Sequence, residues 1–382
     1  MLVTPRRPHI AIFGYPDSEG NAIEMVRAIT ARYPGQVYFL VADPEVARRV
    51  LRSANIEGER LNAIAHRSLT GLRAFVTAEV AMFTHGVYGC PRRVPRKTLV
   101  NLWHGDPLKA GVLTDSRGRP LVHSDFLIAG TKKIGLIMAE RCRLPDDGLL
   151  VTGCPRIDQF GQGNRSQALP LGIDPSRPFV IWMPTFRRSV RLADSNGGYA
   201  DMSAAIQDTN DLAQMTIAGL SRAGIQTVVK PHPSDADSHH IPGAITVTND
   251  DLLSAGLLLY QLIGLSSGLL TDYSSVWIDY LSLDRPIAFI VPDEEAYSSN
   301  RGFDPPDAMS WLPGPRIRNA RDVELYVSDV QSSGKLSQAK RLEVADHLGL
   351  AAADGAVAAR IFEELCARGV VDRHSARNVS QP

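Results

Sequence analysis

The sequence has few cysteines, no long apolar run and no excess of charge of either sign. Its four cysteines are widely spaced with no C-x-x-C pair, which argues against a zinc site or a disulfide framework and fits a reducing cytoplasm. The 41 basic and 41 acidic side chains cancel, so no overall field attracts nucleic acid. The longest apolar stretch, residues 252–270, contains polar side chains and predicts protein core rather than a membrane span.

A length of 382 residues and a hydrophobic content of 44% suit a globular protein of two ordinary domains. One local cluster of charge is a basic stretch over residues 92–97. It predicts either a solvated loop or a contact with anionic lipid or a phosphate-bearing acceptor. We therefore expect a cytoplasmic protein, and leave open a peripheral position on the inner face of the cell membrane.

Short apolar runs alternate with helical patterns along the whole chain. The runs lie at 9–14, 36–42, 80–84, 98–102, 125–129, 149–152, 179–183, 226–230, 244–247, 269–271 and 286–291. This alternation predicts an α/β fold with parallel sheets covered by helices on both faces. A polar stretch at 161–167 has the composition of a linker. The expected parts are an N-terminal α/β domain over 1–160, a C-terminal α/β domain over 168–345, a helix over 346–370 and a disordered tail over 371–382.

Five short segments lie at or just after these apolar runs, and most carry groups that suit a phosphate. They span residues 101–109, 153–158, 183–187, 230–233 and 270–280. The carboxyl ends of parallel strands are where α/β sheets bind their ligands. The segments therefore predict a site assembled from strand ends, although each segment taken alone is also compatible with an ordinary turn or cap.

In the second half, three segments offer phosphate contacts. Ser274 and Ser275 follow a strand and begin a predicted helix, whose free N–H groups and positive end suit a diphosphate. Lys230 and His232 stand at the end of another strand, where His232 can donate to a charged leaving group. Arg187 can hold a phosphate bidentately.

Asp272 precedes the two serines, and we expect it to orient this turn or the acceptor. In the first half, we expect Gly105 to let the backbone approach a ligand closely and Lys109 to contact the acceptor or a phosphate. Residues 153–158 predict a hinge in which Arg156 and Asp158 form an ion pair.

Together and in this order, the five segments resemble the CDP-glycerol glycerophosphotransferase family, whose members build teichoic acids and related phosphodiester polymers. The resemblance runs from Thr98 to about Glu324. It implies two Rossmann-like doubly wound domains facing a cleft, the architecture called GT-B. It also implies that His104 is the base that takes the proton from the acceptor hydroxyl, for which an imidazole is suited.

The chain departs from the family at Asp106, where the family usually has threonine. A carboxylate at this place could raise the pKa of His104, repel a phosphate or contact the acceptor. The departure puts the identity of the acceptor in doubt more than the type of reaction.

The resemblance predicts transfer of glycerol phosphate, or a related polyol phosphate, from a CDP-activated donor to a lipid-linked or polymeric acceptor, with His232 stabilising the phosphates. We expect no cofactor and no metal ion, since the one D-x-D spacing, at Asp235 and Asp237, lies in a polar loop. Two alternatives stay open: a GT-B glycosyltransferase that uses a nucleotide sugar, and a catalytically inactive nucleotide-binding subunit.

Overall fold

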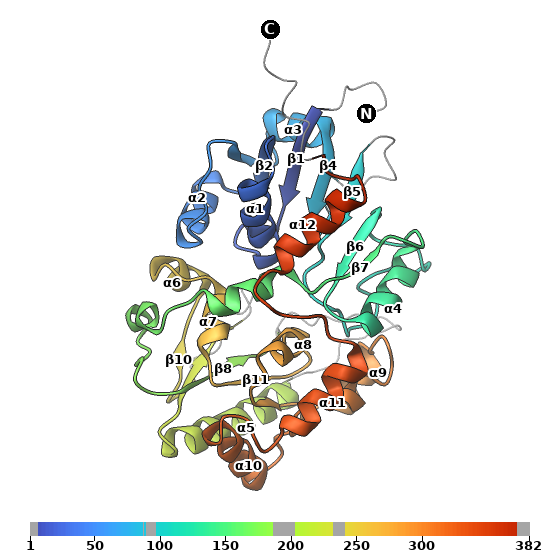
Figure 1. Cartoon of the computed structure of the whole chain (residues 1–382). Helices are drawn as coiled ribbons and strands as arrows, with labels where there is room; N and C mark the ends of the chain where they lie inside the picture. Colours follow the sequence, from blue (N-terminus) through green and yellow to red (C-terminus); the bar gives the residue numbers. More distant parts are fainter. Residues whose placement is uncertain (1–6, 87, 89–96, 186–202, 232–240, 373–382) are drawn as a thin grey trace. The chain divides into compact units, whose positions relative to one another are not determined.

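In a computed structural model, residues 7–86, 88, 97–185, 203–231 and 241–372 are described, and the chain divides into two compact units (Figure 1). Unit 1 draws on residues 1–106, 111–162 and 348–382, and unit 2 on residues 107–110 and 163–347. The C-terminal segment thus belongs with the N-terminal half of the chain. Among the described helices, none has the length and apolar character needed to cross a membrane.

Unit 1 is built on a parallel sheet of seven described strands in the order β3-β2-β1-β4-β5-β6-β7. The strands are β1 (Arg7–Phe13), β2 (Gln36–Val41), β3 (Leu61–Ala65), β4 (Ala78–Phe83), β5 (Thr98–Asn101), β6 (Phe126–Ala129) and β7 (Leu149–Val151). The central strands β1 and β4 are near-continuous apolar runs, as expected for strands buried on both faces. The edge strand β3 is only half-buried, so its sequence lacks such a run and the sequence analysis did not identify it.

The helices of unit 1 include one that comes from the far end of the chain. They are α1 (Gly20–Arg32), α2 (Pro44–Ser53), α3 (Leu69–Thr77), α4 (Lys132–Cys142), the 3-10 helix η1 (Pro155–Gly161) and α12 (Val357–Ala367). Helices α1 and α12 pack side by side, and both contact η1 (Figure 1). Asp158 fixes this arrangement, because its carboxylate accepts from the backbone N–H groups of Val357 at 2.9 Å and Ala358 at 2.8 Å.

The prediction of one helix over 346–370 is wrong. Helix α11 ends at Leu348, and residues 349–356 are not helical before α12 begins at Val357. Gly349 and Gly355 have φ values of +63° and +76°, in the left-handed region that interrupts a right-handed helix.

Unit 2 is built on a second parallel sheet of five described strands in the order β10-β9-β8-β11-β12. Its strands are β8 (Phe179–Met183), β9 (Gln226–Val229), β10 (Ile245–Thr246), β11 (Gly268–Thr271) and β12 (Ile287–Phe289). Its helices are η2 (Arg165–Leu171), α5 (Ser203–Arg222), α6 (Asn249–Ser254), α7 (Leu259–Leu265), α8 (Val276–Tyr280), η4 (Leu281–Leu283), α9 (Glu294–Asn300), η5 (Ala308–Trp311), α10 (Ala320–Gln331) and α11 (Gln338–Leu348).

The core of unit 2 lies between its sheet and the packed pair α5 and α10. Trp182 from β8 and Tyr326 from α10 are both 1% exposed within it. The phenol of Tyr326 donates to the backbone oxygen of Leu269 at 2.9 Å, so α10 is joined to β11 by a hydrogen bond as well as by packing.

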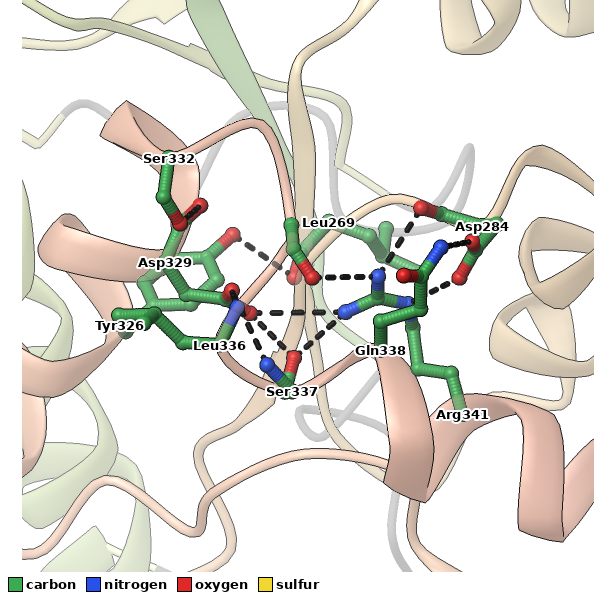
Figure 2. A network of polar contacts seen from close by, with 10 residues as sticks. Leu269, Asp284, Tyr326, Asp329, Ser332, Leu336, Ser337, Gln338 and Arg341 are labelled. Carbon is green, nitrogen blue, oxygen red and sulfur yellow. Dashed lines mark hydrogen bonds and ion pairs between the residues drawn. The ribbon is translucent and has the colours of Figure 1, made fainter.

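A buried guanidinium ties α11 to the turn before β12 (Figure 2). Arg341 is 1% exposed and donates to Asp284 Oδ1 at 2.9 Å, to the backbone oxygens of Asp284 and Gly334 at 3.0 and 2.7 Å, and to Ser337 Oγ at 2.5 Å. Its Nη1 also lies 3.5 Å from the carboxylate of Asp329. A buried charge is tolerated only when its donors are satisfied in this way.

The two sheets share one strand order when each is counted from its own first strand. In both, the first strand lies beside the fourth, and the chain winds outward on either side of that pair. The position between β1 and β4 in unit 1, and between β8 and β11 in unit 2, is the topological switch point of a doubly wound sheet. Ligands bind at the carboxyl end of such a point.

Candidate active site

His104 follows β5, and a backbone carbonyl fixes its ring. Its Nδ1 lies 3.3 Å from the carbonyl oxygen of Thr84, which follows β4. A carbonyl oxygen can only accept, so this bond requires that Nδ1 carry the proton and leaves Nε2 as the basic atom of a neutral ring. In the described part of the chain, no residue forms a hydrogen bond with Nε2. The ring therefore has the tautomer that a general base at Nε2 needs.

Two other rings hold His104 between them. The ring of His85 is stacked on it at 4.0 Å between centroids with 7° between planes, and the indole of Trp103 at 4.6 Å and 24°. Within the described residues, His85 and Trp103 make no ring contact with each other, so they lie on opposite faces of the His104 ring. The imidazole plane is thereby fixed from both sides.

The surroundings keep His104 uncharged. Burial, then the neighbouring His85 and Arg156, lower the pKa of His104 from 6.5 to about 3, although its bond to Thr84 acts in the opposite direction. The pKa of His85 is lowered as well, by partial burial of its ring and by Arg156. At neutral pH the His104 ring is therefore uncharged, with the lone pair of Nε2 available for a proton, although a pKa of about 3 makes it a weak base in the free protein.

The turn that carries His104 adopts an uncommon backbone conformation. Trp103 has a φ of +48°, a region that side chains other than glycine rarely occupy. Hydrogen bonds fix it on both sides: its N–H donates to Asn101 Oδ1 at 2.9 Å, and its carbonyl accepts from Asn21 Nδ2 at 3.0 Å. Such strain persists only where the surrounding structure imposes it.

Arg156 supports the same turn. Its Nη1 donates to the carbonyl oxygen of His104 at 2.8 Å, and its backbone N–H donates to Asn21 Oδ1 at 3.0 Å. The sequence predicts an ion pair between Arg156 and Asp158 in a hinge. In the structure the carboxylate of Asp158 accepts from the start of α12, and Arg156 reaches the backbone of the proposed base.

Gly105 lies against this guanidinium and has a φ of +111°. A Cβ atom at this position would lie 2.2 Å from Arg156 Nη2. We expect Gly105→Ala to lower the free energy of unfolding by about 1–3 kcal/mol more than Gly118→Ala does, because the added methyl displaces the guanidinium. Gly118 is the control for a side chain added at positive φ where nothing lies within 4 Å of the Cβ position. Its φ of +66° lies in the left-handed region that side chains tolerate better than the +111° of Gly105, so backbone strain and the contact with Arg156 both contribute to the expected difference. Urea unfolding of both variants measures the difference, and equal losses would show that the close contact with Arg156 has no cost.

The expectation that Asp106 raises the pKa of His104 is wrong. Asp106 is 2% exposed, and its carboxylate accepts from the backbone N–H of Gly130 at 2.9 Å and from the hydroxyl of Thr131. It therefore anchors the start of α4, and the groups that determine the pKa of His104 are His85, Thr84 and Arg156. This buried, bonded carboxylate also argues against the contact with a phosphate or the acceptor that the sequence analysis considered.

The residues after Asp106 belong to the other unit. Lys109 forms an antiparallel bridge with Phe303, where Ala110 N–H donates to the carbonyl of Gly302 at 3.1 Å and Asp304 N–H to that of Leu108 at 3.0 Å. The segment that the sequence analysis treated as one motif thus contributes its histidine to unit 1 and Lys109 to unit 2.

At the switch point of unit 2, Asp272 joins the ends of β8 and β11. Its Oδ2 accepts from both the N–H and the hydroxyl of Thr185, at 2.9 and 2.8 Å, and its Oδ1 accepts from Ser274 N–H at 3.3 Å. Asp272 is 2% exposed. It orients the turn, one of the two roles expected of it.

The two serines lie at this switch point, and their hydroxyls make few hydrogen bonds with neighbouring described residues. Ser275 makes no side-chain cap, and Ser274 Oγ is 3.5 Å from Val276 N, the limit of a hydrogen bond. Helix α8 has only five residues, so its dipole is weaker than the sequence analysis assumed. A phosphate here would be bound by hydroxyl and N–H groups.

Lys230 follows β9 and is buried at 5% exposure. Its Nζ donates to the carbonyl of Pro231 at 3.1 Å. Burial lowers the pKa of Lys230 to about 8, and Asp251 partly opposes this shift. The amine is still mostly protonated at neutral pH and can neutralise an anion. Arg187 and His232 lie outside the described residues.

His85, Thr84 and the role of Arg156 are not predicted from the sequence. A signal was present for His85, because His85 and Gly86 follow an apolar run just as His104 and Gly105 do. Arg156 gave no such signal, since its contact with His104 spans 52 residues of sequence.

Two doubly wound parallel sheets, each with polar side chains at the carboxyl ends of its strands, define a two-unit α/β protein, and sheets of this topology bind their ligands at such ends. Residues 9–367 match the model of the CDP-glycerol:poly(glycerophosphate) glycerophosphotransferase family, and the chain belongs to this family. The resemblance found in the sequence is confirmed.

Individual relatives agree with this placement. The chain is 28% identical over 253 residues to a teichoic acid ribitol-phosphate primase and 26% identical over 251 residues to a teichoic acid poly(glycerol phosphate) polymerase, both from Bacillus spizizenii. These matches cover 63% and 60% of this chain, and 59% and 60% of the relatives, so the chain spans about three fifths of their length.

A solved structure of a variant of the wall teichoic acid polymerase TagF superposes with a TM-score of 0.73 at 16% identity. The match covers 98% of this chain and 91% of that one. At this identity the likeness shows a shared fold, and the predicted α/β class with two doubly wound parts is confirmed.

Proposed function

We propose that the chain transfers glycerol phosphate, or a close polyol phosphate, from a CDP-activated donor to a hydroxyl of a lipid-linked or polymeric acceptor. Membership of the glycerophosphotransferase family and the named activities of the relatives support this reaction. The observation that carries it is the neutral, ring-stacked His104, whose Nε2 has no hydrogen-bond partner among the described residues.

In the proposed step, the acceptor oxygen attacks the β-phosphorus of the donor in line. A new P–O bond forms, the bond from the β-phosphorus to the bridging oxygen breaks, and CMP leaves with that oxygen. The acceptor proton passes to Nε2 of His104. Because CMP leaves as an anion, the step is faster when cations and N–H donors are already placed around the phosphates.

Unit 2 supplies such groups. Lys230 is a buried cation at the end of β9, and the hydroxyls of Ser274 and Ser275 lie at the switch point that Asp272 orients. Arg187 and His232 complete the proposed set. Since these residues provide the positive charge, the proposal includes no divalent ion.

Contact with a membrane surface stays a prediction. Three residues of its basic stretch, Arg92, Arg93 and Arg96, lie outside the described residues. The fourth, Lys97, is 4% exposed and donates to the carbonyl of Phe75, so it is directed into unit 1 rather than toward a lipid headgroup.

Calorimetric titration with CDP-glycerol, CDP-ribitol and a UDP-sugar tests the donor, and release of CMP with and without a membrane extract tests the transfer. We expect saturable binding of a CDP-polyol and CMP release that depends on the acceptor and is unchanged by EDTA. Binding of the UDP-sugar alone would show a glycosyltransferase instead. Donor binding without turnover would show an inactive nucleotide-binding subunit.

A further inference from the structure

The switch point of unit 1 carries side chains that the proposed reaction does not yet use. In unit 2, the corresponding position between β8 and β11 holds Asp272 and the serines assigned to the donor. In unit 1, the position between β1 and β4 holds Tyr15, two residues after β1, and Thr84 and His85, directly after β4. His104 is at the end of the adjacent strand β5.

Thr84 connects these side chains. Its hydroxyl accepts from the backbone N–H of Tyr15 at 3.3 Å and lies 3.0 Å from Nδ1 of His85, while its carbonyl bonds Nδ1 of His104. Both imidazoles are therefore held through Nδ1 by the same residue. In the described part of the chain neither Nε2 has a hydrogen-bond partner, so these nitrogens of two stacked imidazoles can bind a ligand.

Tyr15 adds an exposed aromatic face. Its side chain is 58% exposed, although most aromatic residues of unit 1 are in the core. Its ring stands edge-on to that of His85, with 6.1 Å between centroids and 83° between planes. An exposed, rigid aromatic ring gives a large contact area at a small cost in conformational entropy.

We propose that Tyr15 and His85 form a subsite for a saccharide ring of the acceptor, next to His104. The Tyr15 ring packs against the apolar C–H face of the saccharide, and Nε2 of His85 hydrogen-bonds a hydroxyl near the one that His104 deprotonates. An acyclic polyol phosphate has no such face, so the aromatic ring favours a cyclic, hydroxyl-rich ligand. The binding of a saccharide ring at Tyr15 and His85 does not depend on the proposed function. Only the identification of that saccharide as part of the acceptor rests on it.

The test is binding of saccharides to the full chain in the absence of any donor. The probes are methyl pyranosides of glucose, N-acetylglucosamine and N-acetylmannosamine, with glycerol 3-phosphate as the acyclic comparison. Protein labelled with ¹³C at histidine Cε1 reports on His85 and His104, whose signals are assigned by single substitution. Saturation transfer shows which ligand protons contact the protein.

We expect at least one pyranoside to shift both histidine signals saturably, with transfer to its C–H protons. Tyr15→Ala should weaken this binding about tenfold, whereas Tyr15→Phe, which keeps the ring, should leave it within about twofold. His85→Phe keeps the stacking but removes the ring nitrogens and should weaken binding about fivefold. Leu136→Ala is the matched control, since Leu136 is 55% exposed on α4 of the same unit and no effect is expected.

If no pyranoside shifts the two signals, or if Tyr15→Ala binds as the native chain does, the subsite is absent. The same conclusion follows if glycerol 3-phosphate alone shifts them. These outcomes are independent of the reaction. Saccharide binding without CMP release would support the subsite and contradict the proposed transferase activity. CMP release with a polyol acceptor, but without saccharide binding, would contradict the subsite alone.

Discussion

Replacing His104 by glutamine is expected to slow acceptor-dependent CMP release by about a hundredfold to ten-thousandfold, the usual contribution of a general base. Glutamine can keep a hydrogen bond to the carbonyl of Thr84 but cannot take up a proton. The initial rate of CMP release at saturating donor measures the loss, with near-ultraviolet circular dichroism as the test of folding.

The matched control is His66→Gln. His66 follows β3 in the same sheet, and its Nδ1 also bonds a backbone carbonyl, that of Val41, at 2.9 Å. We expect the His66→Gln protein to release CMP at a rate within a fewfold of the native rate. A folded His104→Gln protein that keeps more than a tenth of the native rate would contradict the role of His104 as base.

The pH dependence of the same reaction tests the electrostatics of the site. The His104 pKa of about 3 means that acid inactivates the free protein through this residue only near pH 3, whereas an ordinary imidazole would do so near 6.5. Bound phosphates add negative charge, which favours the imidazolium and raises this pKa. The acid limb of kcat, which reports on the substrate complex, should therefore lie at higher pH than that of kcat/KM. A limb of kcat/KM near pH 6.5 that is lost in His104→Gln would show that the ring is more solvated than the structure indicates.

Arg341→Met is expected to destabilise unit 2 by about 3 kcal/mol. The substitution fills a similar volume but removes the cation that contacts Asp284 and Asp329 (Figure 2). The side chains of these two residues are 35% and 7% exposed. The expected loss of stability lies at the lower end of the range for a broken buried ion pair. Asp329 keeps hydrogen bonds from the N–H groups of Leu336 and Ser337 and from the Ser337 hydroxyl, and Asp284 is partly solvated.

Lys340→Met on the same helix is the matched control. Lys340 forms an ion pair with Glu343 at 2.7 Å, but the two side chains are 46% and 66% exposed, so its loss should cost less than about 1 kcal/mol. Urea unfolding followed by tryptophan fluorescence suits this comparison, because Trp182, Trp277 and Trp311 are all in unit 2 and only Trp103 is in unit 1. Equal midpoints for the two variants would show that the buried guanidinium adds no stability.

The sequence by itself determined the family, the α/β class and the positions of most strands. This was possible because strands buried on both faces are continuous apolar runs, and because His104, Lys230 and Ser274 follow such runs directly. Both signals are local, so they can be read without knowing which strands are neighbours. Two elements were not predicted, for different reasons. The edge strand β3 is only half-buried and so has no continuous apolar run, and the break at 349–356 depends on two glycines in left-handed conformation.

Only the tertiary structure decided what surrounds His104. The strand order places β1 beside β4, so Tyr15 meets Thr84 across 69 residues of sequence, and η1 brings Arg156 to the His104 carbonyl across 52. The pKa of His104 follows from burial and from His85, Thr84 and Arg156 rather than from Asp106, its neighbour in sequence. Hydrogen bonds and desolvation depend on which residues are close in space. In a sheet where consecutive strands are not always adjacent, residues far apart in the sequence can be close in space, so these effects cannot be inferred from the sequence alone.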